Sequence, residues 1–289
     1  MNPVQRDVPL KDFSTFKIGG PAKYFIEADT PEALSQSLTY AKQNRLPFFI
    51  LGKGSNCLFD DRGFDGLVIL NKIALCEFLE SGLVRVGAGY SFSLLGAQTA
   101  KKGLSGLEFA SGIPGSVGGA VFMNAGANGS ETADVIESVE YLLEDGKCLL
   151  LNREQISFSY RWSSFQEKKG AILLATFRLK CSEESRSKQL NLIAYRKQTQ
   201  PLASLSAGCV FRNPEGGFAG QVIEKCGLKG FCIGRAKVSE IHANFIVNTG
   251  TATSLEVQEL IRFIQKTVKE KAALDLQCEV KMIPYQGLV

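Results

Sequence analysis

Residues 111–127 read SGIPGSVGGAVFMNAGA, and the interpretation of the whole chain depends on this glycine-rich stretch. It contains five glycines among apolar residues. Glycine allows unusual backbone dihedral angles and a close approach of the backbone to a ligand, which suits a flat or phosphorylated ligand. Tight packing of chain against chain would need the same glycines, so the stretch alone leaves both explanations open.

A second glycine loop, LGKGSN, covers residues 51–56 and follows the apolar strand predicted at residues 47–51. Gly52 and Gly54 would let successive N–H groups converge on an anion. A tight turn explains this spacing equally well. The spacing matches neither the GxGxxG fingerprint nor a Walker A loop. Two such loops in one chain favour a dinucleotide that is held in neither a Rossmann unit nor a P-loop.

The composition excludes several classes of function. The net charge is only +4, and no basic run with interleaved aromatic residues supports nucleic-acid binding. The eight cysteines form no Cys-x-x-Cys pair and the chain has one histidine, so we expect no metal site. We find no signal peptide and no window of roughly 18 apolar residues that could span a membrane. We therefore expect a cytoplasmic protein without membrane insertion.

The order of the predicted elements indicates an α+β fold. A strand at 22–28, a helix that starts at Pro31 after the cap Thr30, and strands at 47–51 and 66–70 form a small β-α-β unit. Hairpin strands then dominate from about residue 75 to 182, around a long glycine-rich segment at 103–129. Residues 183–199 are predicted to form a helical connector.

The C-terminal part is predicted to contain two helices and a final strand. Apolar residues at helical spacing run from Ala219 to Cys226, and Gly227 ends that helix. Thr253 and Glu256 form a capping box for the second helix. In the strand at 276–283, Glu279 and Lys281 face away from the apolar residues.

Six motifs, in order, resemble the UDP-N-acetylenolpyruvoylglucosamine reductase family, within the vanillyl-alcohol-oxidase type of FAD-binding proteins. They are FSTFKIGGPA (13–22), SYRWSSF (159–165), SAGCVFRNP (206–214), AGQVIEKCGLKG (219–230), IHANFIVNTGTAT (241–253) and LQCEVKMI (276–283). The resemblance covers essentially the whole chain. It implies two FAD-binding subdomains, residues 1–72 and 73–182, and a substrate-binding domain at residues 183–289, with strands that can exchange between the parts.

The resemblance implies an enzyme of peptidoglycan precursor synthesis. NADPH would reduce non-covalently bound FAD, which would then reduce the enolpyruvyl group of UDP-N-acetylglucosamine enolpyruvate to give UDP-N-acetylmuramate. We expect a monomer that binds this UDP-sugar. Two alternatives stay open: another FAD oxidoreductase of the same superfamily, and a catalytically inactive flavin-binding protein.

By this resemblance, both glycine loops hold the flavin cofactor. The residues implied are Gly52, Lys53, Gly54, Ser55, Asn56, Gly115, Ser116, Gly118, Gly119 and Asn124.

Arg161 and Glu279 match the two catalytic residues of the family that are charged. A planar guanidinium can hold a carboxylate through two parallel hydrogen bonds, and this contact strengthens as negative charge develops. A carboxyl group beside that carboxylate is useful if it is protonated or orients a partner. From the residues alone, a surface arginine stacked on Tyr160 or Trp162 and a solvated glutamate explain both positions as well.

Cys209 stands where the family usually has serine, the proton donor to the substrate's α carbon. A free thiol, with a pKa of about 8.5, is a far stronger acid than a serine hydroxyl. The resemblance therefore implies that Cys209 is the proton donor. A buried small hydrophobic residue is the main alternative.

The resemblance also implies four substrate contacts: Tyr160, Arg212, Asn213 and His242. Asn213 and Arg212 would contact the diphosphate, and His242 would lie near the sugar. Thr199 stands where the family often has a lysine, which removes one expected phosphate contact. The chain also lacks the extra loop with a substrate-capping tyrosine that longer members have, so it resembles the shorter variant.

Overall fold

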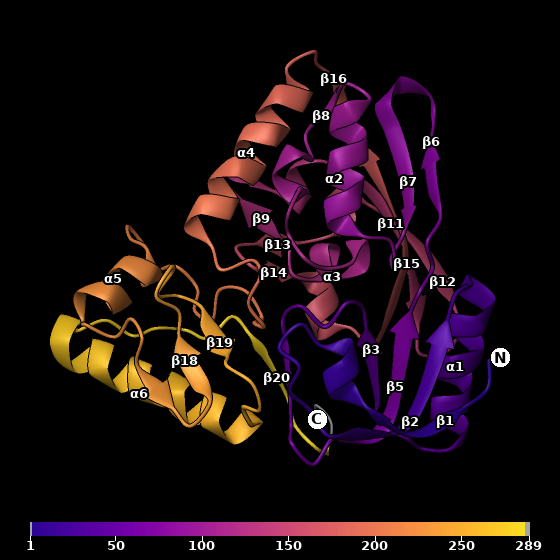
Figure 1. Ribbon diagram of the computed structural model, residues 1–289. Helices are drawn as coiled ribbons and strands as arrows, with labels where there is room; N and C mark the ends of the chain where they lie inside the picture. The colour runs from indigo at the N-terminus through magenta and orange to yellow at the C-terminus, as the bar shows by residue number, and fades with distance from the viewer. Residues whose placement is uncertain (1, 287–289) are drawn as a thin grey trace. The chain divides into compact units, whose positions relative to one another are not determined.

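Residues that lie far apart in the sequence group together in space in this protein. The computed structural model describes residues 2–286 and divides them into two units (Figure 1). Unit 1 consists of residues 2–5, Phe25–Lys53 and Leu67–Arg196. Unit 2 consists of Arg6–Tyr24, Gly54–Gly66 and residues 197–286. These units divide the chain differently from the three predicted subdomains, because 6–24 and 54–66 group with the C-terminal part.

Unit 1 is built on an antiparallel five-stranded sheet in the order β12-β11-β15-β7-β6. The strands are β6 (Cys76–Phe78), β7 (Leu83–Gly87), β11 (Ile136–Leu143), β12 (Cys148–Asn152) and β15 (Gly170–Arg178). The predicted hairpins are confirmed here, since β11 and β12 pair around a turn in which Gly146 has a φ of 89°.

Three helices of unit 1 follow the start of this sheet in sequence. They are α2 (Phe92–Lys101), α3 (Val117–Phe122) and α4 (Ser185–Thr199). In α4, the residues up to Arg196 belong to unit 1. Apolar residues of α2 and α3 form one buried core with β7, β11 and β15. The sequence pattern does not predict two of these helices: α2 lies in the region expected to form hairpins, and α3 lies inside the glycine-rich segment.

A second sheet contains the predicted β-α-β unit. Its order is β1-β2-β5-β3, and its strands are β1 (Gln5–Pro9), β2 (Pro21–Ala28), β3 (Phe48–Leu51) and β5 (Phe64–Asn71). Helix α1 (Pro31–Gln43) starts after the cap Thr30, whose side chain accepts from the Ala33 N–H. This confirms the predicted strands and helix, and it adds that β5 lies between β2 and β3.

Unit 2 combines a three-stranded sheet, order β17-β18-β19, with helices α5 and α6 (Figure 1). The elements are β17 (Cys232–Ile233), β18 (Ala236–Val238), β19 (Ile246–Asn248), α5 (Ala219–Lys225) and α6 (Ser254–Ala272). Both helices were predicted. The core includes Phe16, Ile18 and Leu58, which come from the two N-terminal stretches of this unit.

The predicted final strand, residues 276–283, is regular only at its end. β20 (Lys281–Ile283) pairs in parallel with β4 (Cys57–Phe59), while Cys278 forms only an isolated bridge with Phe211. The prediction of a continuous strand was therefore wrong for residues 276–280. The reason is that the backbone of this stretch forms hydrogen bonds with several short segments and not with one long partner strand.

Short elements complete the chain. The two-residue strands pair as β8 (Leu104–Ser105) with β16 (Lys180–Cys181), β9 (Gly126–Ala127) with β10 (Ser130–Glu131), and β13 (Phe158–Ser159) with β14 (Trp162–Ser163). In the described part of the chain, 3-10 turns lie at Leu10–Phe13, Glu80–Gly82, Glu108–Ala110, Thr132–Asp134, Arg153–Gln155 and Ser164–Glu167.

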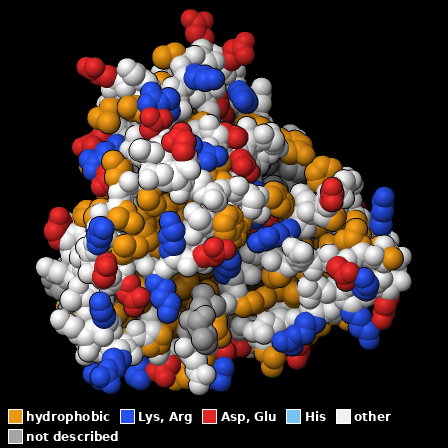
Figure 2. Space-filling view, turned by 180° about the vertical axis from the view of Figure 1, so that it is seen from behind, with side chains coloured by type: hydrophobic (Ala, Val, Ile, Leu, Met, Phe, Trp, Pro, Cys, Tyr) orange, Lys and Arg blue, Asp and Glu red, His pale blue; other side chains and the backbone are white. Residues whose placement is uncertain are grey.

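The surface carries charges of both signs. Figure 2 shows lysine and arginine side chains interspersed with aspartate and glutamate on the face that it presents. Within residues 2–286, no helix has the length and apolar character needed to cross a membrane. The same residues contain no cluster of three or more histidine, cysteine, aspartate or glutamate side chains that could hold a metal ion.

Candidate active site

The two glycine loops meet within unit 1. A Cβ atom added to Gly52 would overlap the hydroxyl oxygen of Ser116, and one added to Gly118 would lie 2.8 Å from the Cβ of Ala88. Close packing therefore explains the glycines at 52 and 118. Gly119 differs, because it is exposed and the nearest atom to an added Cβ is the Ser116 hydroxyl oxygen at 3.4 Å. Of these glycines, Gly119 has the room for a ligand to approach its backbone.

The glycine-rich segment turns into α3 at Ser116. The Ser116 hydroxyl accepts from the Gly119 N–H at 3.3 Å and so caps the helix, while the Gly118 N–H donates to the Ala88 carbonyl at 2.8 Å. Just before it, Gly115 has a φ of 145°, which side chains of L-residues rarely allow. The glycine at 115 is thus required by the backbone itself.

The chain passes from unit 1 to unit 2 inside the loop LGKGSN. Lys53 is exposed and belongs to unit 1, whereas Gly54, Ser55 and Asn56 belong to unit 2. Gly54 has a φ of 59°, and an added Cβ would overlap the carbonyl oxygen of Phe13. Only glycine can adopt this turn in this packing.

The residues of the glycine-rich segment fit a dinucleotide cofactor. Ser111 is 1% exposed, and within residues 2–286 its hydroxyl oxygen has no hydrogen-bond partner. A buried hydroxyl without a partner is costly in the protein alone and is available to a bound polar group. Such a hydroxyl is the kind of donor that a diphosphate accepts, and the exposed backbone at Gly119 leaves room for the ligand to approach.

Arg161 lies in the tight turn of the hairpin β13–β14 in unit 1. Its φ is 56°, in the left-handed region that residues with a side chain seldom adopt. The guanidinium Nη2 donates to the Gly126 carbonyl at 2.8 Å, and its carbon lies 4.8 Å from the centre of the Tyr160 ring. The stacking on Tyr160 that the sequence left open is therefore present. Tyr160 itself is exposed.

Asn124 is completely buried and ties two parts of unit 1 together. Its side-chain Nδ2 donates to the Ser159 carbonyl, and its Oδ1 accepts from the Ala133 N–H, each at 3.0 Å. These bonds give Asn124 a structural role beside the hairpin that carries Arg161. The cofactor contact implied for Asn124 stays a prediction.

Cys209 and Glu279 lie on neighbouring segments of unit 2. The Glu279 N–H donates to the carbonyl of Val210, the residue after Cys209, at 2.7 Å, and Cys209 forms an isolated bridge with Phe245. Asn56 joins the same place, because its Nδ2 donates to the Glu279 carbonyl at 3.3 Å. Unit 2 thus brings together three predicted site residues that come from distant parts of the sequence.

Arg212 stands beside a second cation in unit 2, Lys281. The Arg212 Nε is buried and has no hydrogen-bond partner within residues 2–286. Burial lowers the pKa of Lys281, and the positive charge of Arg212 lowers it further. Sequence reasoning did not select Lys281 as a site residue. Its alternation with Glu279 on one face of the final strand is the signal that could have identified it.

Asn213 and His242 are both engaged in local structure. The Asn213 Oδ1 accepts from the Ala219 N–H at 3.1 Å, at the start of α5. The His242 Nδ1 accepts from the Asn244 N–H at 3.2 Å, and its ring meets the Phe245 ring edge-on with the centroids 5.0 Å apart. Burial lowers the pKa of His242, and the charge of Lys229 lowers it further. Thr199 is the last residue of α4.

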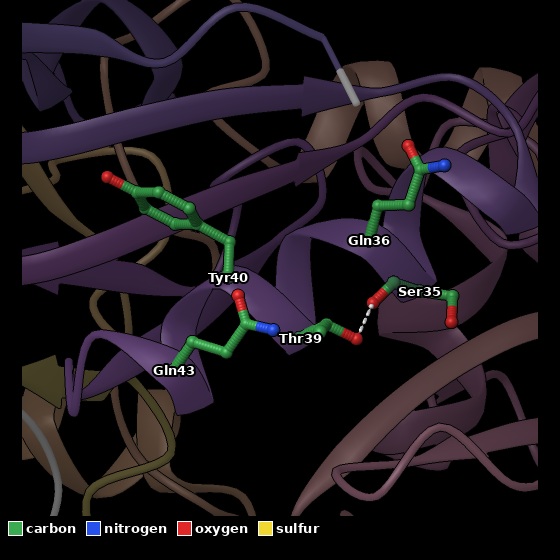
Figure 3. Close-up of a pocket in the computed structure, with 5 residues that line it drawn as sticks. All are labelled: Ser35, Gln36, Thr39, Tyr40 and Gln43. Carbon is green, nitrogen blue, oxygen red and sulfur yellow. Dashed lines mark hydrogen bonds between the residues drawn. The ribbon is translucent and has the colours of Figure 1, made fainter.

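A shallow pocket on α1 includes none of the predicted site residues. It is lined by Ser35, Gln36, Thr39, Tyr40 and Gln43 (Figure 3). The Thr39 hydroxyl donates to the Ser35 carbonyl at 3.0 Å, a bond within the helix that Figure 3 draws. These neutral side chains on one helix offer no convergent charges, so we assign no function to this pocket.

Comparison with known proteins covers nearly the whole chain. The family described as "FAD binding domain" matches residues 22–152, and the family described as "UDP-N-acetylenolpyruvoylglucosamine reductase, C-terminal domain" matches residues 200–283. A UDP-N-acetylenolpyruvoylglucosamine reductase from Protochlamydia amoebophila (strain UWE25) is 58% identical over 284 residues, which is 98% of this chain and 95% of the relative. One from Chlamydia pneumoniae is 49% identical, over 98% and 93%.

A solved structure shows the same fold. The crystal structure of the UDP-N-acetylenolpyruvylglucosamine reductase from Thermus caldophilus superimposes with a TM-score of 0.83 at 37% sequence identity. The match covers 98% of this chain and 99% of that one.

Proposed function

The chain belongs to the UDP-N-acetylenolpyruvoylglucosamine reductase family, and from this premise we propose which of its residues carry out each part of the reaction. The enzyme reduces the enolpyruvyl group of its UDP-sugar substrate with NADPH, in peptidoglycan precursor synthesis. FAD, when bound to the glycine loops, supplies the hydride chemistry. The residues of the chain bind, orient and protonate the substrate.

Arg161 holds the carboxylate of the enolpyruvyl group. A guanidinium offers two parallel N–H donors to a carboxylate, and the contact strengthens when negative charge spreads over the α carbon and carboxylate. The guanidinium lies beside Gly126 of the glycine-rich segment, and this position supports the role. That segment lies within the match to the FAD-binding family.

Cys209 gives its thiol proton to the α carbon, and Glu279 orients the reacting group beside it. The observation that carries this proposal is the 2.7 Å backbone hydrogen bond from Glu279 to the residue after Cys209. It keeps the two segments side by side within one unit. A proton donor must be held within reach of its acceptor, so this fixed spacing matters more than thiol acidity.

Arg212, with Asn213 and Lys281, binds the diphosphate of the substrate, and His242 lies near the sugar. Within residues 2–286 the buried Arg212 Nε has no hydrogen-bond partner, and the neighbouring positive charge of Lys281 also favours a bound anion. An anion between two cations offsets their mutual repulsion and satisfies the donor. We further propose that the enzyme is cytoplasmic and acts as a monomer. Light scattering of the purified protein would test whether it is a monomer.

The role of Cys209 is tested by separating the two halves of the reaction. In Cys209→Ala, NADPH should still bleach the flavin at close to the wild-type rate. Recolouring by the enolpyruvyl substrate should slow by about 10²-fold or more, because the proton donor is missing. Cys209→Ser should recolour within about tenfold of the wild type and should resist inactivation by peroxide, since a hydroxyl does not form a sulfenic acid. Stopped-flow absorbance under anaerobic conditions measures both steps.

Cys232→Ser provides the matched control. Cys232 is also in unit 2, is exposed, and donates to the Gly230 carbonyl. This variant should keep both rates and the peroxide sensitivity of the wild type. Undiminished substrate reduction in Cys209→Ala would show that Cys209 is not the proton donor. A protein that takes up FAD but turns over no substrate in any form would instead favour an inactive flavin-binding protein.

A further inference from the structure

The hairpin that carries Arg161 cannot hold its own position. Its strands β13 and β14 have two residues each, and so short a ribbon is unstable in water without outside contacts. The left-handed backbone of Arg161 adds strain to the turn. The position of this arginine must therefore be set by groups outside the hairpin strands.

Gln166 supplies two of these outside contacts. It lies in the 3-10 turn Ser164–Glu167, and its Nε2 donates to the Arg161 carbonyl at 3.2 Å and to the Phe122 carbonyl at 2.9 Å. A side-chain amide nitrogen has two protons, so it can serve both carbonyls at once. This one side chain thereby joins the backbone of Arg161 to the end of α3.

The remaining contacts lead to the same segment of chain. Asn124 donates to the Ser159 carbonyl at 3.0 Å, and the Arg161 side chain donates to the Gly126 carbonyl at 2.8 Å. Phe122, Asn124 and Gly126 all lie in the glycine-rich segment 111–127, at or just after the end of α3. These bonds thus attach the turn with Arg161 to the segment assigned to the cofactor.

We propose that Gln166 is a positioning residue that sets the place of Arg161 relative to the glycine-rich segment. The proposal rests on the role of Arg161 given above. Loss of the Gln166 donors would free the turn to shift, and a misplacement of about 1 Å can cost about 10²-fold in rate. Arg161 would still be present, so the loss should be in the turnover of bound substrate.

The test compares two replacements of similar length in the FAD-loaded enzyme. Gln166→Met keeps the size but removes the donors, and Gln166→Lys keeps donors. We expect kcat for substrate reduction to fall by about 10- to 10²-fold in Gln166→Met and to recover to within about threefold in Gln166→Lys. The rate of flavin bleaching by NADPH should change by less than about threefold, because that step does not involve Arg161. The fall in kcat should exceed any rise in the KM for the substrate, because the contact of Arg161 with the carboxylate strengthens as negative charge develops.

Ser163→Ala is the matched control. The Ser163 hydroxyl donates to the same Phe122 carbonyl at 2.7 Å, whereas the bond to the Arg161 carbonyl comes from Gln166. It should lower the melting temperature while kcat stays within about threefold of the wild type. An equal loss of kcat in Ser163→Ala, or full kcat in Gln166→Met, would overturn the proposal.

Two further variants keep the result interpretable. Arg161→Lys with normal turnover would reject the catalytic role of Arg161 itself, whereas a large loss there combined with full activity of Gln166→Met rejects only the positioning role. Gln166→Glu serves if the methionine variant fails to fold. An ionised carboxylate cannot donate, so kcat relative to the wild type should rise as the pH is lowered toward the carboxyl pKa. A ratio that does not vary with pH would contradict the proposal.

Discussion

The glycines of this chain serve different structural purposes at different positions. Gly52 and Gly118 allow packing, Gly54 and Gly115 allow a backbone angle, and Gly119 leaves open space. The sequence could not separate these reasons, because they depend on what lies opposite each glycine. Gln166 is a similar case, since an amide in a polar stretch attracts no attention until its two carbonyl partners are known.

His242 should make the stability of the protein depend on pH. Its folded pKa lies below the ordinary value of 6.5 because burial, and to a lesser degree Lys229, disfavour the charged ring. These effects outweigh the opposite effects of a backbone hydrogen bond and of Glu224. The unfolded chain then binds a proton at a higher pH than the folded protein. The stability contributed by neutral His242 is therefore present above about pH 6.5 and is lost as the pH falls through that value.

The variant His242→Asn tests this, because asparagine can still accept from the Asn244 N–H but does not titrate. The melting temperature of the wild type, relative to the variant, should fall between about pH 7.5 and about pH 5.5. A thermal shift series in one buffer system measures the difference. A constant difference across this range would show that His242 titrates alike in the folded and unfolded states.

At the scale of elements, α6 is stabilised at its start by two separate caps. The Thr253 hydroxyl accepts from the Glu256 N–H at 3.1 Å, and Glu256 accepts in return from the Thr253 N–H at 2.9 Å. In addition, the Asp61 carboxylate accepts from the N–H groups of Ser254 and Leu255 at 2.7 and 3.2 Å. The capping box was visible in the sequence, whereas Asp61 comes from a stretch nearly two hundred positions away.

Thr253→Ala should lower the free energy of unfolding by about 1 kcal/mol, because one N–H group at the helix start loses its partner. Thr253→Ser should keep most of it. The midpoint of urea unfolding, at an unchanged slope, measures the effect. The control is Thr267→Ala, since Thr267 is half-buried in the same helix and its hydroxyl donates to the Phe263 carbonyl within that helix, away from the helix start. A shift of the same size in the control would argue against a capping effect.

Helix α4 shows why hydropathy alone misjudges some helices. Its buried residues are Ser185, Gln189 and Arg196, while Leu190 and Tyr195 are about half exposed. Arg196 packs on Gly112 of the glycine-rich segment, with its Cδ 3.7 Å from the place of an added Cβ. The polar pattern predicted that a helix forms here, but the face that packs is defined by the shape of its neighbours.

At the scale of the whole molecule, unit 2 depends on both ends of the chain. Phe16, Ile18 and Leu58 belong to its hydrophobic core, and β4 is the parallel partner of β20. A fragment that starts at Lys197 lacks Phe16, Ile18, Leu58 and strand β4. It would expose part of that core to water and leave a strand without its partner.

We therefore expect the fragment from residue 197 to the C-terminus not to fold alone, although it contains the match to the C-terminal domain of the family. Its proton–nitrogen correlation spectrum should lack dispersion, and heating should give no cooperative transition. The full chain prepared in the same way is the control. A dispersed spectrum and a sharp melt for the fragment would contradict this view of unit 2.

The local pattern of residues was enough to predict the elements with strong signals, such as α1 with its cap at Thr30 and α6 with its capping box. The motifs, taken in order, were enough to indicate the family. These features depend on neighbours along the chain, and one-dimensional spacing records them. The short helix α3 escaped prediction because its glycines disfavour a helix, which forms only where Ser116 caps it and the sheet covers it.

The arrangement of the site depends instead on contacts between residues that the spacing along the chain does not reveal. The contact of Gly52 with Ser116, the bond between the Cys209 and Glu279 segments, and the tie of Gln166 to Arg161 each join residues that spacing does not relate. The two hydrogen bonds form because buried N–H and C=O groups must find partners wherever folding brings the backbone. The Gly52 contact is possible because a residue without a Cβ leaves room for Ser116. The sequence pattern identifies the chemical groups of this protein, and the tertiary structure determines which of them come into contact.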